Sequence, residues 1–235
     1  MALLEVRGLV AGYGPHPVLH GIDFEVEKGE VCVLLGLNGA GKSTTVTTIA
    51  GLLRPMAGEI VFDGRTLGKS SPSSRVRAGM SLSPEGRRIF PRLTVAQNLR
   101  LGAWTQRRHP RRTRQQQELV LDYFPRLSER SDQVAGTLSG GEQQMLAVAR
   151  AVMSSPSLLM IDEASLGLSP TLARTVWEAA ARIARDGVTV LMVEQNAGAL
   201  PFADRALIME KGTLVHTAVG ADVAAVNLRE TYLGA

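Results

Sequence analysis

The chain has 235 residues, of which 45% are hydrophobic, so it is long enough to bury one large core or two modest ones. No apolar run approaches the roughly 18 residues that cross a bilayer, and the early acidic residue Glu5 does not fit a signal peptide. The formal net charge of +4 favours an anionic partner only weakly, while Cys32, the single cysteine, excludes an internal disulfide and fits a reducing cytoplasm.

The first third of the chain predicts β-strands. Its apolar and β-branched runs are separated by glycine, proline or charged turns, which is typical of strands. A helix is predicted after the third run, and it should end before Gly51 because glycine is favoured just past a helix end. The strands are expected at residues 3–9, 21–26, 31–35 and 59–62, and the helix at 44–50.

A glycine-rich turn lies between the third strand and this helix. Strand, glycine-rich turn and helix are the context of a phosphate-binding P-loop, whose backbone N–H groups converge on a phosphate chain at the positive end of the helix dipole. Lys42 is expected to reach the β- and γ-phosphates, and the Ser43 hydroxyl to bind Mg²⁺. The turn alone predicts a nucleotide-binding protein. It reads Gly36-Leu37-Asn38-Gly39-Ala40-Gly41-Lys42-Ser43-Thr44 and fits the pattern G-x-x-x-x-G-K-[ST].

The middle of the chain predicts helices and its last third alternates strands with helices. Ser169 and Pro170 are expected to start a helix that runs to about Asp186, and Asn227 with Glu230 predicts a capped terminal helix. The pattern predicts an α/β fold, with a mainly parallel sheet flanked by helices, an antiparallel β flank and a helical insertion. The expected helices include 95–104 and 115–124, and the expected strands are 158–161, 188–193, 206–209 and 213–217.

A second glycine-rich string precedes one of the later helices. Ser139 is expected to cap this helix while Glu142 reaches back to it, an S-x-x-E capping box at another anion-binding helix start. The string is Leu138-Ser139-Gly140-Gly141-Glu142-Gln143. It resembles the LSGGQ signature of the ABC ATPase family, with Glu142 inserted before Gln143. The resemblance implies a P-loop NTPase core of the ABC-ATPase type.

An acidic pair, Asp162 and Glu163, follows the apolar strand at 158–161. Both carboxylates should emerge at the C-terminal end of that strand, where ligands of parallel sheets bind. Together with the P-loop, the pair is interpreted as a Walker B site. Asp162 is then expected to hold Mg²⁺ through water, and Glu163 to polarise the attacking water.

The resemblance also assigns roles to Tyr13 and to the dimer partner. Tyr13 matches the family's adenine-stacking aromatic, although a tyrosine in a glycine-rich turn is otherwise a surface residue. In this family the P-loop and signature of one chain face opposite ways. The phosphates at Lys42 would therefore be completed by Ser139 of another subunit, so the chain is expected to act as half of a dimer.

Three positions depart from the general family pattern, and one of them is the loop after Glu163, which begins with Ala164 and lacks the proline and the aspartate common elsewhere in the family. Glu85 occupies the place of the Q-loop glutamine, and it would offer a charged oxygen to Mg²⁺. Gln195 occupies the place of the switch histidine, where it can hydrogen-bond the γ-phosphate but cannot become cationic. These departures keep open the alternative of a weakly hydrolysing regulatory subunit that binds nucleotide.

Three strings resemble one branch of the family, the LivF-type ATP-binding subunits of high-affinity branched-chain amino acid importers. They are P-E-G-R-R-I-F-P-x-L-T-V-x-x-N-L from Pro84, S-L-G-L-x-P from Ser165, and V-E-Q-N from Val193. The resemblance runs from about Leu3 to Gly234. It implies a single ABC ATPase domain over 1–235, with a core at 1–84 and 156–235 and a helical subdomain at about 85–155 that carries the signature.

The same resemblance implies a larger assembly. The expected ligands are ATP and Mg²⁺. The expected partners are a second ATPase subunit (LivG-like) or a second copy of this chain, and two membrane permeases. A cytoplasmic helix of a permease would enter a groove lined by residues 85–99. A periplasmic solute-binding protein would deliver the cargo, which is branched-chain amino acids or related solutes such as urea, amides or aromatic acids. The chain is expected at the cytoplasmic face of the inner membrane, as a peripheral subunit.

A basic cluster from Arg107 to Arg114 suggests a rival function. It raises the alternative of a soluble ABC ATPase in DNA repair or translation, but it lacks interleaved aromatics and any groove-reading motif, so no nucleic-acid partner is expected. A solvated turn between helices, or one that touches anionic lipid headgroups, is favoured.

Overall fold

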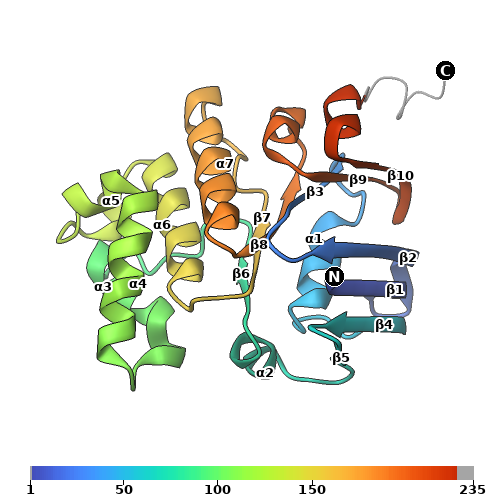
Figure 1. The fold of residues 1–235 in the computed structure, drawn as a ribbon, viewed down its shortest axis with the longest axis horizontal. Helices are drawn as coiled ribbons and strands as arrows, with labels where there is room; N and C mark the ends of the chain where they lie inside the picture. Colours follow the sequence, from blue (N-terminus) through green and yellow to red (C-terminus); the bar gives the residue numbers. More distant parts are fainter. Residues whose placement is uncertain (1, 227–235) are drawn as a thin grey trace.

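The computed structural model of the protein describes residues 2–226, whose strands form two sheets (Figure 1). The six-stranded sheet has the order β10-β9-β3-β8-β7-β6, and the four-stranded sheet has the order β2-β1-β4-β5. The larger sheet contains β3 (Val31–Gly36), β6 (Met80–Ser83), β7 (Leu158–Asp162), β8 (Thr189–Glu194), β9 (Arg205–Glu210) and β10 (Thr213–Val219). The smaller sheet contains β1 (Ala2–Tyr13), β2 (His16–Glu27), β4 (Ala57–Phe62) and β5 (Arg65–Thr66).

The larger sheet is parallel except at one edge. β3 pairs in parallel with β8 and β9, and β7 pairs in parallel with β6 and β8. β10 returns antiparallel along β9, and the pairings of the smaller sheet are all antiparallel. The predicted α/β fold, with a mainly parallel sheet and an antiparallel flank, is confirmed.

Helices cover the larger sheet on both faces. In Figure 1, α3, α4, α5 and α6 gather to the left of the sheet, while α1 lies on the other side, next to β1 and β2. The α-helices are α1 (Lys42–Ile49), α2 (Pro72–Arg77), α3 (Val95–Gly102), α4 (Pro110–Tyr123), α5 (Pro125–Glu129), α6 (Gly140–Val152) and α7 (Pro170–Arg185). Short 3-10 helices are η1 (Ala103–Gln106), η2 (Ala135–Thr137), η3 (Ala197–Phe202) and η4 (Gly220–Ala225).

The central strands are apolar on both faces because each face meets a different core. Along β3, Val31, Val33 and Leu35 belong to one buried cluster, whereas Cys32 and Leu34 belong to the other. This alternation follows from the two-residue period of a strand. It explains why β3, β7 and β8 are continuous apolar runs, as expected for parallel strands covered on both sides. Cys32 is fully buried and is therefore a core residue. The same burial raises the pKa of its thiol.

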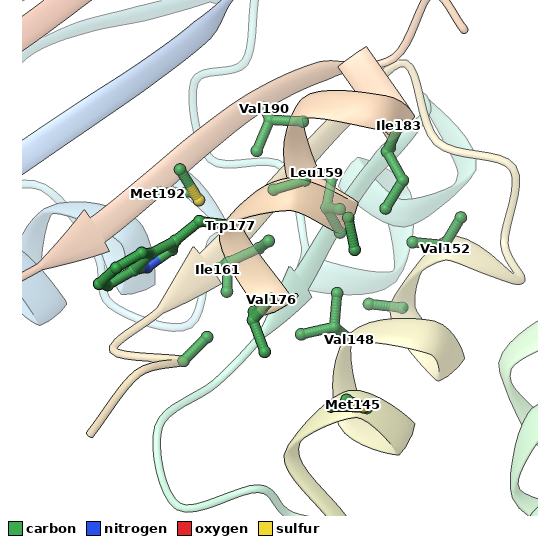
Figure 2. Close-up of a cluster of buried hydrophobic side chains, with 14 of the residues drawn as sticks. Met145, Val148, Val152, Leu159, Ile161, Val176, Trp177, Ile183, Val190 and Met192 are labelled. Carbon is green, nitrogen blue, oxygen red and sulfur yellow. The ribbon is translucent and has the colours of Figure 1, made fainter. Parts of the chain in front are cut away.

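The first cluster joins the sheet to α6 and α7. Figure 2 shows Leu159 and Ile161 of β7 with Val190 and Met192 of β8 beneath α7. Side chains of both helices fill the space above the strands, and those labelled are Met145, Val148, Val152, Val176, Trp177 and Ile183. The second cluster seals the opposite face with residues of α1 and the smaller sheet.

Helix ends follow the capping signals of the sequence. The Ser169 hydroxyl accepts a hydrogen bond from the Leu172 N–H, Pro170 occupies the first turn of α7, and Gly187 adopts a left-handed φ of 96° just past its end. The helix predicted from Asn227 lies outside the described residues. Across residues 2–226, the helices are too short or too polar for any of them to traverse a bilayer.

The sequence pattern does not predict several of the short elements, among them α2 and the edge strand β6. Arg75 of α2 is 2% exposed, and its Nη1 donates to the carbonyls of Thr48 (2.8 Å) and Ile49 (2.7 Å) at the end of α1. Burial lowers the pKa of this guanidinium. Arg75 thus donates to carbonyls at the C-terminal end of the helix that begins at the P-loop, a place where a cation also complements the helix dipole.

We expect Arg75→Ala to lower the free energy of unfolding by about 2–3 kcal/mol, because two buried carbonyls lose a charged donor. Chemical denaturation monitored by circular dichroism measures this change. Arg77→Ala is the matched control, since Arg77 lies exposed on the same helix and should change stability little. Equal effects of the two substitutions would contradict the role given to Arg75.

Candidate nucleotide-binding site

The glycine-rich turn after β3 requires its glycines. Gly39 and Gly41 adopt left-handed φ values of 81° and 107°. A Cβ on Gly41 would lie 2.8 Å from Leu19 Cδ2, so a larger residue would also clash. Gly41 caps α1 without a side-chain hydrogen bond, which leaves the first N–H groups of the helix free of a side-chain partner at the end of the helix that attracts anions.

Lys42 and Glu163 form a buried ion pair across this turn. The distance from Lys42 Nζ to Glu163 Oε1 is 2.9 Å, and the two side chains are 3% and 9% exposed. Lys42 Nζ also donates to the Leu37 carbonyl at 3.1 Å. The ammonium is therefore held against the turn by a carboxylate and a carbonyl, two oxygen acceptors of the kind that a phosphate would also provide.

Ser43 and Asp162 meet beside this pair. The Ser43 hydroxyl donates to Asp162 Oδ1 at 3.0 Å. Burial raises the pKa of Asp162 to about 6; the Ser43 hydrogen bond and Lys42 oppose the rise, while the negative charges of Glu163 and Glu85 add to it. A hydroxyl and a carboxylate are hard oxygen donors of the type that Mg²⁺ takes, and the accumulated negative charge favours a cation there.

The donor set suits a metal shared with phosphate and water rather than a protein cage. Within residues 2–226, no group of three or more His, Cys, Asp and Glu side chains is arranged to hold a metal ion. Mg²⁺ commonly binds through one or two carboxylates and completes its coordination with substrate phosphates and waters. Ser43 and Asp162 fit that requirement.

The loop after Glu163 is tied to β8. Glu163 has a left-handed φ of 48°, and its N–H donates to the Val193 carbonyl at 2.9 Å. Ser165 donates to the buried Glu194, which also accepts from Trp177 Nε1 at 3.0 Å. Burial raises the pKa of Glu194, and these two donors oppose the rise. The backbone of Glu163 is thus fixed to the strand that ends just before Gln195.

The side chains of Gln195 and Tyr13 are both exposed to solvent, where a ligand can reach them. Gln195 follows β8 directly, and across the described part of the chain its side chain makes no hydrogen bond. Tyr13 is the last residue of β1 and is 61% exposed. The first part of the glycine-rich turn is also exposed to solvent, at Leu37, Asn38 and Gly39. Ala40 and Thr44 are buried.

The signature string begins α6 with the predicted capping box, which is confirmed. The Glu142 N–H donates to the Ser139 hydroxyl at 3.3 Å, and the Ser139 N–H donates to Glu142 Oε2 at 2.9 Å. Arg130 Nε lies 2.7 Å from Glu142 Oε1. Leu138 is buried in the core, which anchors the string. Gly140 and Gly141 form the first turn of α6.

The structure does not bring the signature to the P-loop of the same chain. The helix α6 packs into the first core cluster and α1 into the second, on the opposite face of the larger sheet (Figure 1). The P-loop residues, Asp162 and Glu163 converge at the carboxyl ends of β3 and β7, whereas Ser139 belongs to the helical side of the molecule. The starts of α1 and α6 are therefore separate sites in this chain.

Between these two parts lies a cleft of about 490 Å³, whose lining includes Glu85, Glu163 and Gln143. Sequence reasoning missed one of its residues, Arg87, whose Nη1 donates to Gln143 Oε1 at 3.0 Å. Arg87 and Arg88 have left-handed φ values of 66° and 48°, which are costly for residues other than glycine. The string Pro84–Arg88 can be recognised in the sequence. The contact of Arg87 with Gln143 of the signature, however, depends on the fold.

Comparisons with known proteins agree on one family. The family model described as ABC transporter matches residues 19–166. The branched-chain amino acid transport ATP-binding protein BraG of Pseudomonas aeruginosa is 45% identical over 224 residues, which cover 94% of this chain and 95% of the relative. A probable branched-chain amino acid transport ATP-binding protein LivF of Archaeoglobus fulgidus is 34% identical and covers 89% of each chain.

Solved structures agree with the fold. An ATP-binding subunit of an ABC transporter superposes with a TM-score of 0.84 at 30% identity, over 98% of both chains. A nucleotide-free ATP-binding cassette from an ABC transporter superposes with a TM-score of 0.87 at 24% identity, over the whole of both chains, which supports the fold alone. With the extent of the family match and the identity to BraG, these likenesses lead to one conclusion: the chain belongs to the ABC transporter family.

Proposed function

We propose that this chain is the ATP-hydrolysing subunit of an ABC importer, which binds ATP at a dimer interface and powers the uptake of branched-chain amino acids or related small polar solutes. The observation that carries the proposal is the convergence of Lys42, Ser43, Asp162 and Glu163 at the carboxyl ends of β3 and β7. The 45% identity to BraG over nearly the whole chain supports both the importer and the class of cargo.

In the proposed site, the turn from Gly36 to Thr44 wraps the phosphates and Tyr13 stacks on the base. Lys42 exchanges Glu163 and the Leu37 carbonyl for phosphate oxygens. Ser43 and Asp162 would hold Mg²⁺, and Glu85 would contribute an oxygen from the edge of the cleft. When bound, the ion neutralises the charge on the β- and γ-phosphates.

The chemical step is hydrolysis of the bond between the γ-phosphorus and its bridging oxygen. Glu163 takes a proton from the attacking water as the water oxygen bonds to the γ-phosphorus; the bond from that phosphorus to the bridging oxygen breaks, and ADP leaves with the bridging oxygen. Gln195 donates to the γ-phosphate. Because Gln195 cannot become cationic, we expect slower hydrolysis at a site built on this chain than at one with a histidine.

The separation of P-loop and signature supports a composite site between two subunits. The signature from Leu138 to Gln143 of one subunit would supply donors to the ATP held by Lys42 of the other, either a LivG-like ATPase or a second copy of this chain. Closure on ATP and reopening after hydrolysis would drive two permeases, which receive cargo from a periplasmic binding protein. The chain would then lie on the cytoplasmic face of the membrane.

We propose that residues 85–155 act as the helical subdomain of a single ATPase domain, with 1–84 and 156–235 as its core. Phe90 lines a groove of about 340 Å³ between α2, α3 and α6, which supports a seat for a permease helix near segment 85–99. The relatives named for amino-acid transport favour this function over a soluble ATPase of DNA repair or translation, and the intact Glu163 favours it over a regulatory subunit without turnover.

Replacement of Glu163 by Gln should reduce ATP turnover at least about 100-fold, because an amide cannot act as a base. Binding of MgATP, measured by isothermal titration, should persist. Without nucleotide the variant should melt at a lower temperature than the unsubstituted chain, since Lys42 loses its counter-ion, and ATP should narrow that gap. Glu178→Gln, at an exposed position of α7, is the control; a Glu163→Gln variant with unchanged turnover would refute the assignment.

Two inactive variants of this chain should complement each other. Lys42→Ala removes the P-loop contribution and Ser139→Ala the signature contribution. A mixed dimer would contain one intact site, so mixing should restore ATPase activity that neither variant has alone. Turnover of the unsubstituted chain should also fall on dilution. Full activity per chain at high dilution, together with no rescue on mixing, would show that one subunit suffices.

A further inference from the structure

A basic hollow outside the nucleotide site lies where η1 leads into α4. Its volume is about 660 Å³, and its lining includes Arg100, Arg107 and Arg114 together with Leu101 and Trp104, but no acidic residue. The guanidinium carbon of Arg107 lies 4.8 Å from the centre of the Trp104 ring. The hollow therefore combines positive charge with an apolar, aromatic wall.

The surrounding segment carries arginines without counter-ions. From Arg87 to Gln117 the sequence contains nine arginines and no aspartate or glutamate. We call residues 107–114 the arginine turn; its arginines, at positions 107, 108, 111, 112 and 114, are all exposed and form no ion pair with any residue of 2–226. Some exposed arginines outside this segment do form ion pairs, as Arg126 does with Glu129 and Arg174 with Glu178.

The arginine turn lies at the edge of the molecule that carries the groove near Phe90. Leu101 and Trp104 line both the hollow and that groove. In Figure 1 the green segment that joins α3 to α4 and the helix α2 both reach the lower edge of the view. If the groove seats a permease helix, as in the proposed function, the arginine turn lies on the side that approaches the membrane.

We propose that the arginine turn and its hollow bind the phosphate headgroups of anionic phospholipids. Guanidinium groups match phosphate oxygens bidentately, and a row of them near a membrane is attracted by its negative surface. Trp104 is 63% exposed, and its amphipathic ring next to arginines suits the headgroup level of a bilayer. Only the direction in which the turn faces rests on the proposed function.

A lipid surface fits these features better than nucleic acid does. Proteins that bind single strands use several aromatics along a positively charged groove, whereas Trp104 is the one aromatic residue of the hollow. The arginine turn projects at the edge of the molecule, and a projecting cluster of charge can meet a flat membrane. Headgroups can fill the hollow while Leu101 and Trp104 contact the glycerol region.

Vesicle co-sedimentation of the purified chain tests the proposal. The chain should bind phosphatidylcholine vesicles that contain phosphatidylglycerol, should bind phosphatidylcholine alone weakly, and should lose affinity as salt rises. Arg111→Gln with Arg112→Gln should weaken binding at least about 20-fold, since each basic residue near the surface contributes about fivefold. Trp104 emission should shift to the blue on binding, while Trp177, which is 4% exposed, stays unchanged.

The matched control removes the same charge elsewhere. Arg185→Gln with Lys211→Gln alters exposed positions, and Arg185 lies near the far end of α4, where Tyr123 donates to Asp186 at 2.6 Å. This double variant should change vesicle affinity less than about twofold. Equal loss in both double variants, equal binding to both kinds of vesicle, or competition by inorganic phosphate alone would overturn the proposal.

Two further outcomes would also overturn it. Loss of oligonucleotide binding in the Arg111→Gln, Arg112→Gln variant with unchanged vesicle binding would indicate a nucleic-acid surface. Loss of permease association in detergent without anionic lipid would indicate a protein contact. The proposed function fails separately: a chain that drives ATP turnover in the assembled transporter but ignores anionic vesicles refutes the lipid site alone, and lipid binding without any turnover refutes the ATPase alone.

Discussion

The buried contact between Lys42 and Glu163 is the constraint around which the site is built. Removal of two charges from water is costly, and a 2.9 Å contact between them offsets this cost while no phosphate is present. The same contact keeps Lys42 inside the glycine-rich turn and Glu163 at the end of β7. In the proposed function, an incoming phosphate replaces Glu163 as the partner of Lys42 and leaves the carboxylate free to meet water.

The order of strands in the larger sheet makes this contact possible. β8 lies between β3 and β7. The P-loop and the acidic pair therefore follow the carboxyl ends of two parallel strands that are separated by one strand. The Glu163 N–H bonds to the Val193 carbonyl, which fixes the acidic loop to β8 and brings Gln195 to the same edge. Core packing on both faces holds β3, β7 and β8 in this register.

Several parts of this arrangement could be predicted from local sequence. The P-loop, the capping boxes and the continuous apolar strands depend on neighbouring residues, whose spacing carries the signal. The edge strand β6 and the helix α2 could not, because each is short and has little periodicity of its own. Arg75 reads as an ordinary surface residue, yet it is buried against carbonyls 26 and 27 residues away.

The sequence by itself determined the fold class, the glycines of the phosphate-binding turn and the identity of the polar side chains available for chemistry. The tertiary structure decided which of them meet: Lys42 with Glu163, Ser43 with Asp162, and Arg87 with Gln143. It also decided the raised pKa of Asp162, which depends on burial and on charges brought from other segments. Local patterns record backbone preference and the alternation of burial, whereas such pairings depend on the order of strands in the sheet, which no short window of sequence contains.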